Sequence, residues 1–234
     1  MTKILDCTLR DGGHENNWFF DDNFIQDYLK NLKNIDFCEI GYRNYFDRTN
    51  KGTFFYCTPQ IVQKYKNTSA KFGVMTDTTR FLIDSFIGAE NDCIDFIRIA
   101  THPDKINETL NIANNLYKKN YNIFIQLMEI PNLKTEHYKI LEKWNNKKIL
   151  QSLYIADSYS QAQPKDLKKY FERLKNIGFD KISFHSHNGK KLALENTLKA
   201  IELGAYSVDV TQNGLGGNLN ASKLFKKLSI NFGI

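Results

Sequence analysis

Two histidines, His185 and His187, follow the apolar run Ile182-Ser183-Phe184 and are separated by a single residue. On a β-strand, side chains two positions apart point to the same face, so both imidazoles can bind one metal ion. A carboxylate, Asp11, follows a second apolar run near the N-terminus. If the two segments meet in space, the three side chains leave coordination positions open for water and substrate. The pattern therefore predicts a catalytic metal site.

This ligand set suits Mn²⁺, Mg²⁺, Co²⁺ or Zn²⁺, and completion by oxygen ligands would favour Mn²⁺ or Mg²⁺. Each residue also has an ordinary structural interpretation. An HxH pair occurs by chance, and Asp11 could cap a turn that Gly12 and Gly13 help to form. The metal interpretation requires a fold that brings Asp11 close to His185 and His187.

The elements that would position these residues alternate along the chain. Short apolar, β-branched or aromatic runs predict eight strands, and each interval between them is long enough for one helix. Pro164 could open a helix that ends at Gly178, and a second helical pattern over 194–201 would end at Gly204. The predicted strands are Lys3–Leu5, Phe37–Ile40, Lys71–Met75, Asp95–Ala100, Asn122–Met128, Leu150–Ala156, Lys181–His185 and Ser207–Val210.

Eight βα units in 234 residues match a (β/α)8 TIM barrel formed by one domain, residues 1–234. A doubly wound open sheet is the alternative. In a barrel, the carboxyl ends of all the strands meet at one mouth, so polar residues at those ends converge. The residues that would converge are Arg10, Asp11, Glu39, Arg98, Asp157, Ser158, His185 and His187.

The composition is typical of a soluble globular protein, with 41% apolar and 25% charged residues. We expect a cytoplasmic protein, because no apolar run reaches the roughly 18 residues of a membrane span and no signal-peptide pattern is present. The formal charge of +6 comes from lysines interleaved with Asn and Glu, which indicates a solvated surface and argues against nucleic-acid binding. The cysteines lack CxxC spacing and are expected to be reduced thiols: Cys7, Cys38, Cys57 and Cys93.

Several of these segments resemble one family. LDCTLRDGGH, CEIG, RIATH, ADS, HSHN and GLGGNLNAS are similar to segments of the DRE-TIM metallolyase (HMGL-like) superfamily, and the resemblance runs from residue 4 to about residue 225. It implies that Asp11, His185 and His187 bind a divalent metal ion. It also implies that Arg10 stabilises an enolate and that Glu39 supports this arginine.

Within the superfamily, two features favour the 4-hydroxy-2-oxovalerate aldolase branch. His14 stands where synthases that condense acyl-CoA with a 2-oxo acid usually carry Gln, and the segment from Arg98 to His102 is again similar to the aldolase branch. By this resemblance, His14 would take the proton from the 4-hydroxyl during cleavage, and Ser158 would help to hold the pyruvate carboxylate. Arg98 and His102 are expected to contribute to substrate binding.

The chain also departs from that branch. Its resemblance ends soon after the eighth strand, so we expect neither a closing helical extension that supplies a tyrosine nor a complex with an acylating aldehyde dehydrogenase. The segment 16–20, NNWFF, is unlike that branch. In the glycine-rich segment after the last strand, Asn220 is the expected supporting amide on the metal side, and Asn218 is its rival. The loop Tyr42–Tyr56 is rich in aromatic and basic residues, which would suit a sugar-like or phosphorylated substrate. An ordinary barrel rim has the same composition. These residues include Tyr42, Arg43, Tyr45, Phe46 and Arg48.

The function hypothesis is a divalent-metal-dependent aldolase or lyase that cleaves or forms the carbon–carbon bond next to a pyruvate enolate. Its partners would be a small 2-oxo acid and an aldehyde, with no nucleic acid and no membrane, and with a homo-oligomer left open. Two alternatives remain: a Claisen-type synthase that uses an acyl-CoA, and a non-catalytic barrel that binds a small anion or a partner.

Overall fold

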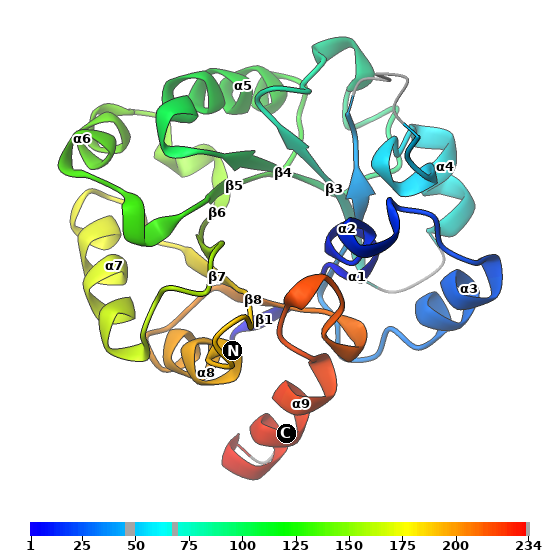
Figure 1. Ribbon diagram of the computed structural model, residues 1–234. Helices are drawn as coiled ribbons and strands as arrows, with labels where there is room; N and C mark the ends of the chain where they lie inside the picture. Colours follow the sequence, from blue (N-terminus) through cyan, green and yellow to red (C-terminus); the bar gives the residue numbers. More distant parts are fainter. Residues whose placement is uncertain (45–49, 67–69, 233–234) are drawn as a thin grey trace.

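All eight predicted strands form, and they pair in chain order as one closed parallel barrel in the computed structural model (Figure 1). The structure describes residues 1–44, 50–66 and 70–232. Each strand pairs with its neighbours in parallel, and the last strand closes the barrel against the first. The (β/α)8 TIM-barrel prediction is therefore confirmed. The strands are β1 (Lys3–Asp6), β2 (Phe37–Tyr42), β3 (Lys71–Asp77), β4 (Phe96–Thr101), β5 (Ile123–Leu127), β6 (Leu150–Asp157), β7 (Ile182–Ser186) and β8 (Ser207–Val210).

The helices pack around the outside of the barrel and at its mouth (Figure 1). Both helices predicted to end before a glycine are confirmed as α7 and α8. The α-helices are α1 (Thr8–Asp11), α2 (Gly13–Asn16), α3 (Asp22–Lys30), α4 (Pro59–Tyr65), α5 (Ile106–Lys118), α6 (Thr135–Lys143), α7 (Pro164–Asn176), α8 (Ala193–Glu202) and α9 (Ala221–Phe232). Short 3-10 helices are η1 (Thr53–Phe55), η2 (Ile83–Ser85), η3 (Pro103–Lys105), η4 (Ile130–Asn132), η5 (Lys147–Ile149) and η6 (Gln212–Gly217).

The crossover between β3 and β4 differs from the expectation of one helix in each interval. Residues 78–95 contain only the 3-10 helix η2. This segment buries Phe86, whose ring packs edge to face on Tyr121 and lies 5.3 Å from the Arg43 guanidinium. Phe86, together with the buried Ile94, thus provides apolar packing that a helix would otherwise have presented to the barrel.

Aromatic rings fill the interior of the barrel below its mouth. Phe37, Phe96 and Phe124 cross edge to face with ring centroids 5.2–5.6 Å apart, and Tyr154 adjoins Phe124 at 5.8 Å. Such edge-to-face pairs are the favoured packing of aromatic side chains. An apolar layer of the barrel interior therefore lies beneath the polar residues of the mouth.

A layer of buried charges lies one step further along the strands. Arg98 follows Phe96 by two residues, so it points into the barrel, and its guanidinium donates to Glu39 and to Asp209. The guanidinium also lies 4.6 Å from the centroid of the Tyr154 ring. We expected Arg98 to bind substrate, but it is fully buried and does not line the pocket described below. It instead holds Glu39 and Asp209 in place beneath the site.

Replacing Arg98 by methionine is expected to lower the free energy of unfolding by about 3–5 kcal/mol, because the buried Asp209 loses its arginine partner and the buried Glu39 loses one of its two. Urea denaturation followed by circular dichroism measures this change. The exposed pair of Lys199 with Glu202, 2.7 Å apart, supplies the control. Lys199→Met should cost less than about 1 kcal/mol, since a surface pair is screened by solvent. Equal losses for the two variants would contradict the assignment of a structural role to the Arg98 network.

Two expectations from composition can be compared with the structure. All four cysteines are free thiols, as predicted, and three of them are buried. Across the described residues, none of the helices combines the length and the apolar character that a membrane crossing requires.

Candidate active site

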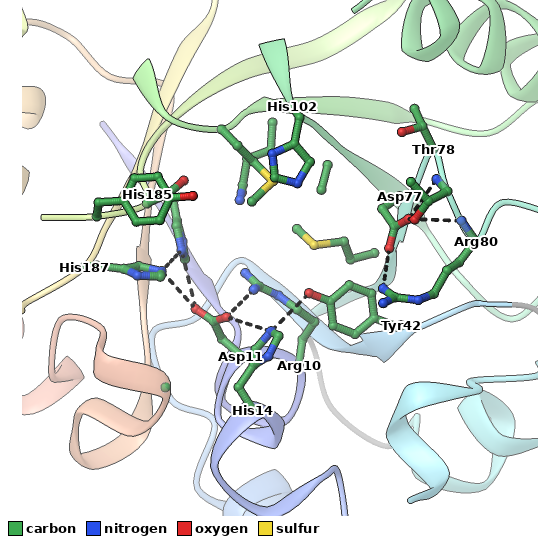
Figure 2. Close-up of a pocket in the computed structure, with 18 residues that line it drawn as sticks. Arg10, Asp11, His14, Tyr42, Asp77, Thr78, Arg80, His102, His185 and His187 are labelled. Atoms are coloured by element: carbon green, nitrogen blue, oxygen red, sulfur yellow. Dashed lines mark hydrogen bonds and ion pairs between the residues drawn. The ribbon is translucent and has the colours of Figure 1, made fainter. Parts of the chain in front are cut away.

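The three predicted metal ligands meet at the mouth of the barrel (Figure 2). His185 lies in β7, and His187 is the first residue after that strand. Asp11 is the last residue of the short helix α1, which follows β1 in the chain. The two imidazole Nε2 atoms are 3.0 Å apart, and Asp11 Oδ2 lies 3.4 Å from the first and 3.6 Å from the second. Two adjacent ligands at about 2.1 Å from one ion lie roughly 3 Å from each other. The three atoms therefore fit one face of a metal coordination shell.

His185 is oriented by a carboxylate on the neighbouring strand. Its Nδ1 lies 2.8 Å from Asp209 Oδ2, which leaves Nε2 directed toward Asp11 and His187. Carboxylates in this position fix the tautomer of metal-binding histidines. Burial alone would lower the pKa of His185, but the hydrogen bonds to Asp11 and Asp209 outweigh burial and raise it. The sequence interpretation missed Asp209, although an acidic residue inside the apolar strand β8 was an available signal.

Arg10 joins the metal-ligand candidates to the buried charge layer. Its Nε donates to Glu39 Oε1 and its Nη1 to Asp11 Oδ1, each at 2.5 Å. The third nitrogen, Nη2, is buried and has no hydrogen-bond partner among the described residues. Arg10 itself lines the pocket, so this unpaired nitrogen belongs to a side chain that borders the cavity.

The charges of this cluster favour a cation. Burial alone would raise the pKa of Asp11, but the charge of Arg10 and the hydrogen bonds of His185 and His187 hold it well below its usual range. Apart from His185, whose imidazole is neutral when it binds a metal ion, the buried cluster contains two guanidinium groups and three carboxylates, which leaves one net negative charge. The members of this cluster are Arg10, Arg98, Asp11, Glu39 and Asp209. A divalent ion would offset this charge inside a medium of low dielectric.

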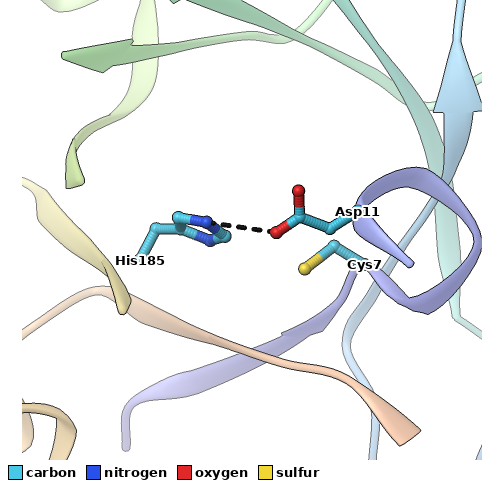
Figure 3. A group of neighbouring side chains, drawn as sticks. All are labelled: Cys7, Asp11 and His185. Carbon is cyan, nitrogen blue, oxygen red and sulfur yellow. Dashed lines mark ion pairs between the residues drawn. The ribbon is translucent and has the colours of Figure 1, made fainter. Parts of the chain in front are cut away.

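A cysteine also lies within reach of this site. Cys7, Asp11 and His185 each place one ligand atom within 4.8 Å of the other two (Figure 3). Burial, more than the opposing charge of Arg10, raises the pKa of the Cys7 thiol well above its usual value. Its sulfur is 3.5 Å from the carbonyl oxygen of Val210, to which the thiol donates. His187 is the alternative third ligand, since its Nε2 lies 3.0 Å from His185 Nε2 and 3.6 Å from Asp11 Oδ2.

The two rival asparagines are separated by the structure. The Asn218 amide donates to Asp11 Oδ2 at 2.5 Å, and its side chain is buried. The side chain of Asn220, which we expected on the metal side, accepts the backbone N–H of Ser222 at the start of α9. Gly216 makes the close approach of this segment feasible: its φ is +71°, and a Cβ there would lie 2.7 Å from the backbone of Asp11. The amide beside Asp11 is thus Asn218.

His14 stands at the edge of the same pocket, on α2. Its Nε2 lies 3.4 Å from the Tyr42 hydroxyl and 3.8 Å from Asp11 Oδ1. Trp18 packs edge to face against the imidazole with centroids 4.7 Å apart, and its indole N–H donates to the carbonyl of Arg10 at 2.8 Å. The segment NNWFF thus holds His14 and Arg10 together. Sequence interpretation gave Trp18 no role and placed Tyr42 only in a loop suited to substrate, because the contacts of both residues come from other segments of the chain.

These groups line one cavity of about 490 Å³ at the mouth. Ser158, whose hydroxyl accepts the Glu129 N–H at 3.0 Å, and His102, 2.9 Å from the Glu129 carboxylate, lie on its wall. The loop residues Tyr45, Phe46 and Arg48, considered above as pocket residues, lie outside the described residues. The predicted site residues that line the cavity are Arg10, Asp11, His14, His102, Ser158, His185 and His187, whereas Glu39, Arg98 and Asn220 do not.

Comparison with known families agrees with this geometry. The model of the HMGL-like family matches residues 1–228. The chain belongs to the HMGL-like family. The suspected superfamily is therefore confirmed, and the match covers the whole barrel together with the ligand candidates at both ends of the chain.

Named relatives of this HMGL-like chain are distant. It is 28% identical over 240 residues to 4-hydroxy-2-oxovalerate aldolase of Carboxydothermus hydrogenoformans, a match that covers 94% of the chain and 68% of the relative. It is 22% identical over 218 residues to oxaloacetate decarboxylase of Mycobacterium tuberculosis, which covers 91% of the chain and 65% of the relative. The chain thus spans about two thirds of the length of these curated relatives.

Solved structures show the same barrel as this HMGL-like chain. The N-terminal domain of a candidate aldolase from Bacteroides vulgatus superposes with a TM-score of 0.91 at 27% identity, over 99% of the chain and 81% of that domain. HMG-CoA lyase of Bacillus subtilis gives a TM-score of 0.78 at 15% identity, over 98% of the chain and 86% of the lyase. The second likeness concerns the fold alone.

Proposed function

We propose that this HMGL-like protein is a divalent-metal-dependent aldolase that cleaves a 4-hydroxy-2-oxo acid into pyruvate and an aldehyde, or joins them in the reverse direction. The observation that carries the proposal is the convergence, in one cavity, of the ligand face with a free arginine donor and a histidine base. Asp11, His185 and His187 would hold the ion, with Asn218 supporting Asp11. The ligand set favours Mn²⁺ or Mg²⁺.

Cleavage of the bond next to the 2-oxo group leaves a pyruvate enolate, whose negative charge has to be stabilised as it forms. A bound divalent ion supplies Lewis-acid stabilisation at this point. Arg10 adds a fixed positive charge, because Glu39 and Asp11 hold two of its nitrogens and leave Nη2 as a donor for the enolate oxygen. Ser158 would donate its hydroxyl proton to the substrate carboxylate, since its oxygen already accepts a backbone N–H.

His14 is proposed to accept the proton of the 4-hydroxyl. Burial lowers the pKa of this histidine, although the charge of Asp11 opposes the effect, so the ring is neutral at pH 7 and ready to accept a proton. Burial also raises the pKa of Tyr42 to about 12, which keeps its hydroxyl protonated as a neutral neighbour of the imidazole.

Replacing His14 by alanine tests the proposed base. Loss of a general base typically costs about 100- to 10,000-fold in rate, and His14 is half-exposed, so the variant should keep its fold. Pyruvate release from 4-hydroxy-2-oxo acids in the presence of Mn²⁺ measures the effect. His137→Ala on α6, where the ring contacts the backbone of Lys134, is the matched control and should retain full activity. A His14→Ala enzyme as fast as this control would refute the role.

A second candidate is decarboxylation of oxaloacetate, which the mycobacterial relative favours. This reaction also leaves a pyruvate enolate, so it needs Arg10 and the ligand face but no base for a hydroxyl. If the chain is a decarboxylase, His14→Ala should leave carbon dioxide release from oxaloacetate intact. A Claisen-type synthase would instead release thiol from acetyl-CoA when 2-oxo acids are present, and that result would overturn the aldolase proposal.

A further inference from the structure

An arginine on the wall of the cavity has unused hydrogen-bond donors. Arg80 follows β3 and lines the cavity, and 43% of its side chain is exposed. Its Nη1 donates to Asp77 Oδ2 at 2.9 Å, whereas its Nε and Nη2 make no hydrogen bond within the described residues. These two nitrogens form one edge of the guanidinium, and such an edge matches two oxygens of a carboxylate or a phosphate.

The acidic neighbour of Arg80 is occupied by the turn that follows β3. Asp77 Oδ1 accepts the backbone N–H groups of Thr79 and Arg80, and also the hydroxyl of Thr79. Asp77 Oδ2 accepts the Arg80 Nη1. A guanidinium carries five N–H donors, so this ion pair does not exhaust it. The carboxylate therefore fixes the turn and one end of the arginine, and leaves the other edge for a ligand.

Aromatic rings connect Arg80 with the proposed base. The Arg80 guanidinium lies 5.5 Å from the centroid of the Phe55 ring. The Phe55 ring lies 4.6 Å from the ring of Trp18 and 5.6 Å from that of Tyr42. Both of these residues contact the imidazole of His14. Arg80 therefore borders the same side of the mouth as His14.

The order of the strands places this side at one end of the substrate. Ser158, proposed to hold the substrate carboxylate, follows β6, the ligand face lies at β7 and β1, and His14 follows β1. The barrel then continues with β2 and β3, which Arg80 follows. Figure 2 shows Tyr42 between the ligand face and Arg80. If the carboxylate lies at Ser158 and the 4-hydroxyl at His14, the carbons beyond the 4-hydroxyl lie beside β2 and β3.

A second cation lies near the same aromatic rings. The ammonium of Lys51 donates to the side chain of Asn17 at 2.5 Å and lies 5.3 Å from the Trp18 ring. The next residue, Gly52, approaches the backbone of Trp18 so closely that a Cβ would lie 1.9 Å from its carbonyl oxygen. The segment NNWFF, which is unlike the aldolase branch, therefore positions this lysine. Lys51 and Arg80 bring two positive charges to the side of the mouth that follows His14.

We propose that the aldehyde half of the substrate ends in an anionic group, a carboxylate or a phosphate, which binds Arg80 and is attracted by Lys51. This inference rests on the proposed aldolase function and names its substrate class. A neutral alkyl end would leave the unused donors of Arg80 to water. An anionic end accepts from Nε and Nη2 together and offsets the charge of the two cations.

The wild-type protein gives the first test. With pyruvate and Mn²⁺, aldol formation is compared within two pairs of aldehydes: succinic semialdehyde with butanal, and glyceraldehyde 3-phosphate with glyceraldehyde. In at least one pair, kcat/KM for the anionic aldehyde should be higher by about tenfold or more, the usual effect of hydrogen bonds to a charged group. The pair that responds distinguishes a carboxylate from a phosphate. The preference should decrease as the ionic strength is raised, because salt screens exposed charges.

Three variants locate the preference. Arg80→Gln removes the charge and should abolish most of the preference, mainly by raising KM for the anionic aldehyde. Arg80→Lys keeps the charge without the paired donors and should retain part of the preference. Arg173→Gln on α7, where the guanidinium likewise lies over an aromatic ring, that of Tyr138, is the matched control and should leave the preference unchanged.

The outcomes separate this inference from the function on which it rests. Equal kcat/KM within both pairs of aldehydes would overturn the role of Arg80 and leave the aldolase intact. An Arg80→Gln enzyme that is slower with anionic and neutral aldehydes by the same factor would assign Arg80 to the structure of the turn, and would also overturn the inference. Absence of product with every aldehyde, together with no cleavage of 4-hydroxy-2-oxo acids, would reject the proposed function and the inference with it.

Discussion

Replacing Arg10 by lysine is expected to lower the rate of carbon–carbon bond cleavage by about 100- to 1000-fold while the barrel stays folded. The positive charge survives in this variant, but its geometry does not. Arginine uses Nε for Glu39 and Nη1 for Asp11, which leaves Nη2 as a donor fixed in direction. A lysine ammonium is a single point charge, so it cannot hold both carboxylates and also present a donor to the substrate.

The measurement is the steady-state rate of pyruvate release with saturating Mn²⁺, accompanied by a thermal melt of each protein. The loss should fall mainly on kcat, because the developing enolate charge is what Arg10 stabilises. Arg173→Lys on α7, where the guanidinium lies over the ring of Tyr138, serves as the control and should keep its rate. An Arg10→Lys enzyme with unimpaired kcat would show that the fork of hydrogen bonds has no part in catalysis.

Replacing His187 by alanine is expected to weaken Mn²⁺ binding by at least about 100-fold, since even residues that only support metal ligands cost 10- to 100-fold when mutated. His187 is the most exposed of the three proposed ligands, so its removal should disturb the fold least. Titration calorimetry of protein treated with a chelator and dialysed measures the affinity directly. Pyruvate release should fall in parallel and recover in part at high Mn²⁺ concentration.

Two further variants make this test specific. His137→Ala removes a histidine from the helix α6 and should bind Mn²⁺ as the parent does. Cys7→Ala should also bind normally if His187, and not the buried thiol, is the third ligand. Loss of binding in Cys7→Ala with retention in His187→Ala would exchange the two assignments.

The fold and the convergence of Asp11, His185 and His187 could be predicted from the sequence because both rest on local patterns. A barrel strand appears in the sequence as a short apolar run. The spacing of His185 and His187 alone predicts that their side chains point to the same face. The remaining step, the approach of Asp11, follows from the rule that the carboxyl ends of all barrel strands share one mouth. None of these inferences needed a side-chain contact between distant residues.

The errors share a physical cause. Arg98 was assigned to the substrate, but the partners that hold it, Glu39 and Asp209, come from β2 and β8 and are invisible in a local motif. The sequence pattern does not distinguish Asn218 from Asn220, because both follow the same glycine-rich segment. Only the path of that segment in the fold decides which amide reaches Asp11. Contacts of long sequence separation therefore set the limit of what the sequence could predict.

The closure of β8 against β1 has a consequence for the order of events during folding. Asp11 belongs to the start of the chain, whereas His185 and His187 belong to its last quarter. A nascent chain on the ribosome cannot present all three groups until the segment that carries His185 and His187 has been synthesised. A divalent cation would therefore not guide early collapse of the chain. It would bind after β1 and β8 have paired, and would then slow the separation of these two strands.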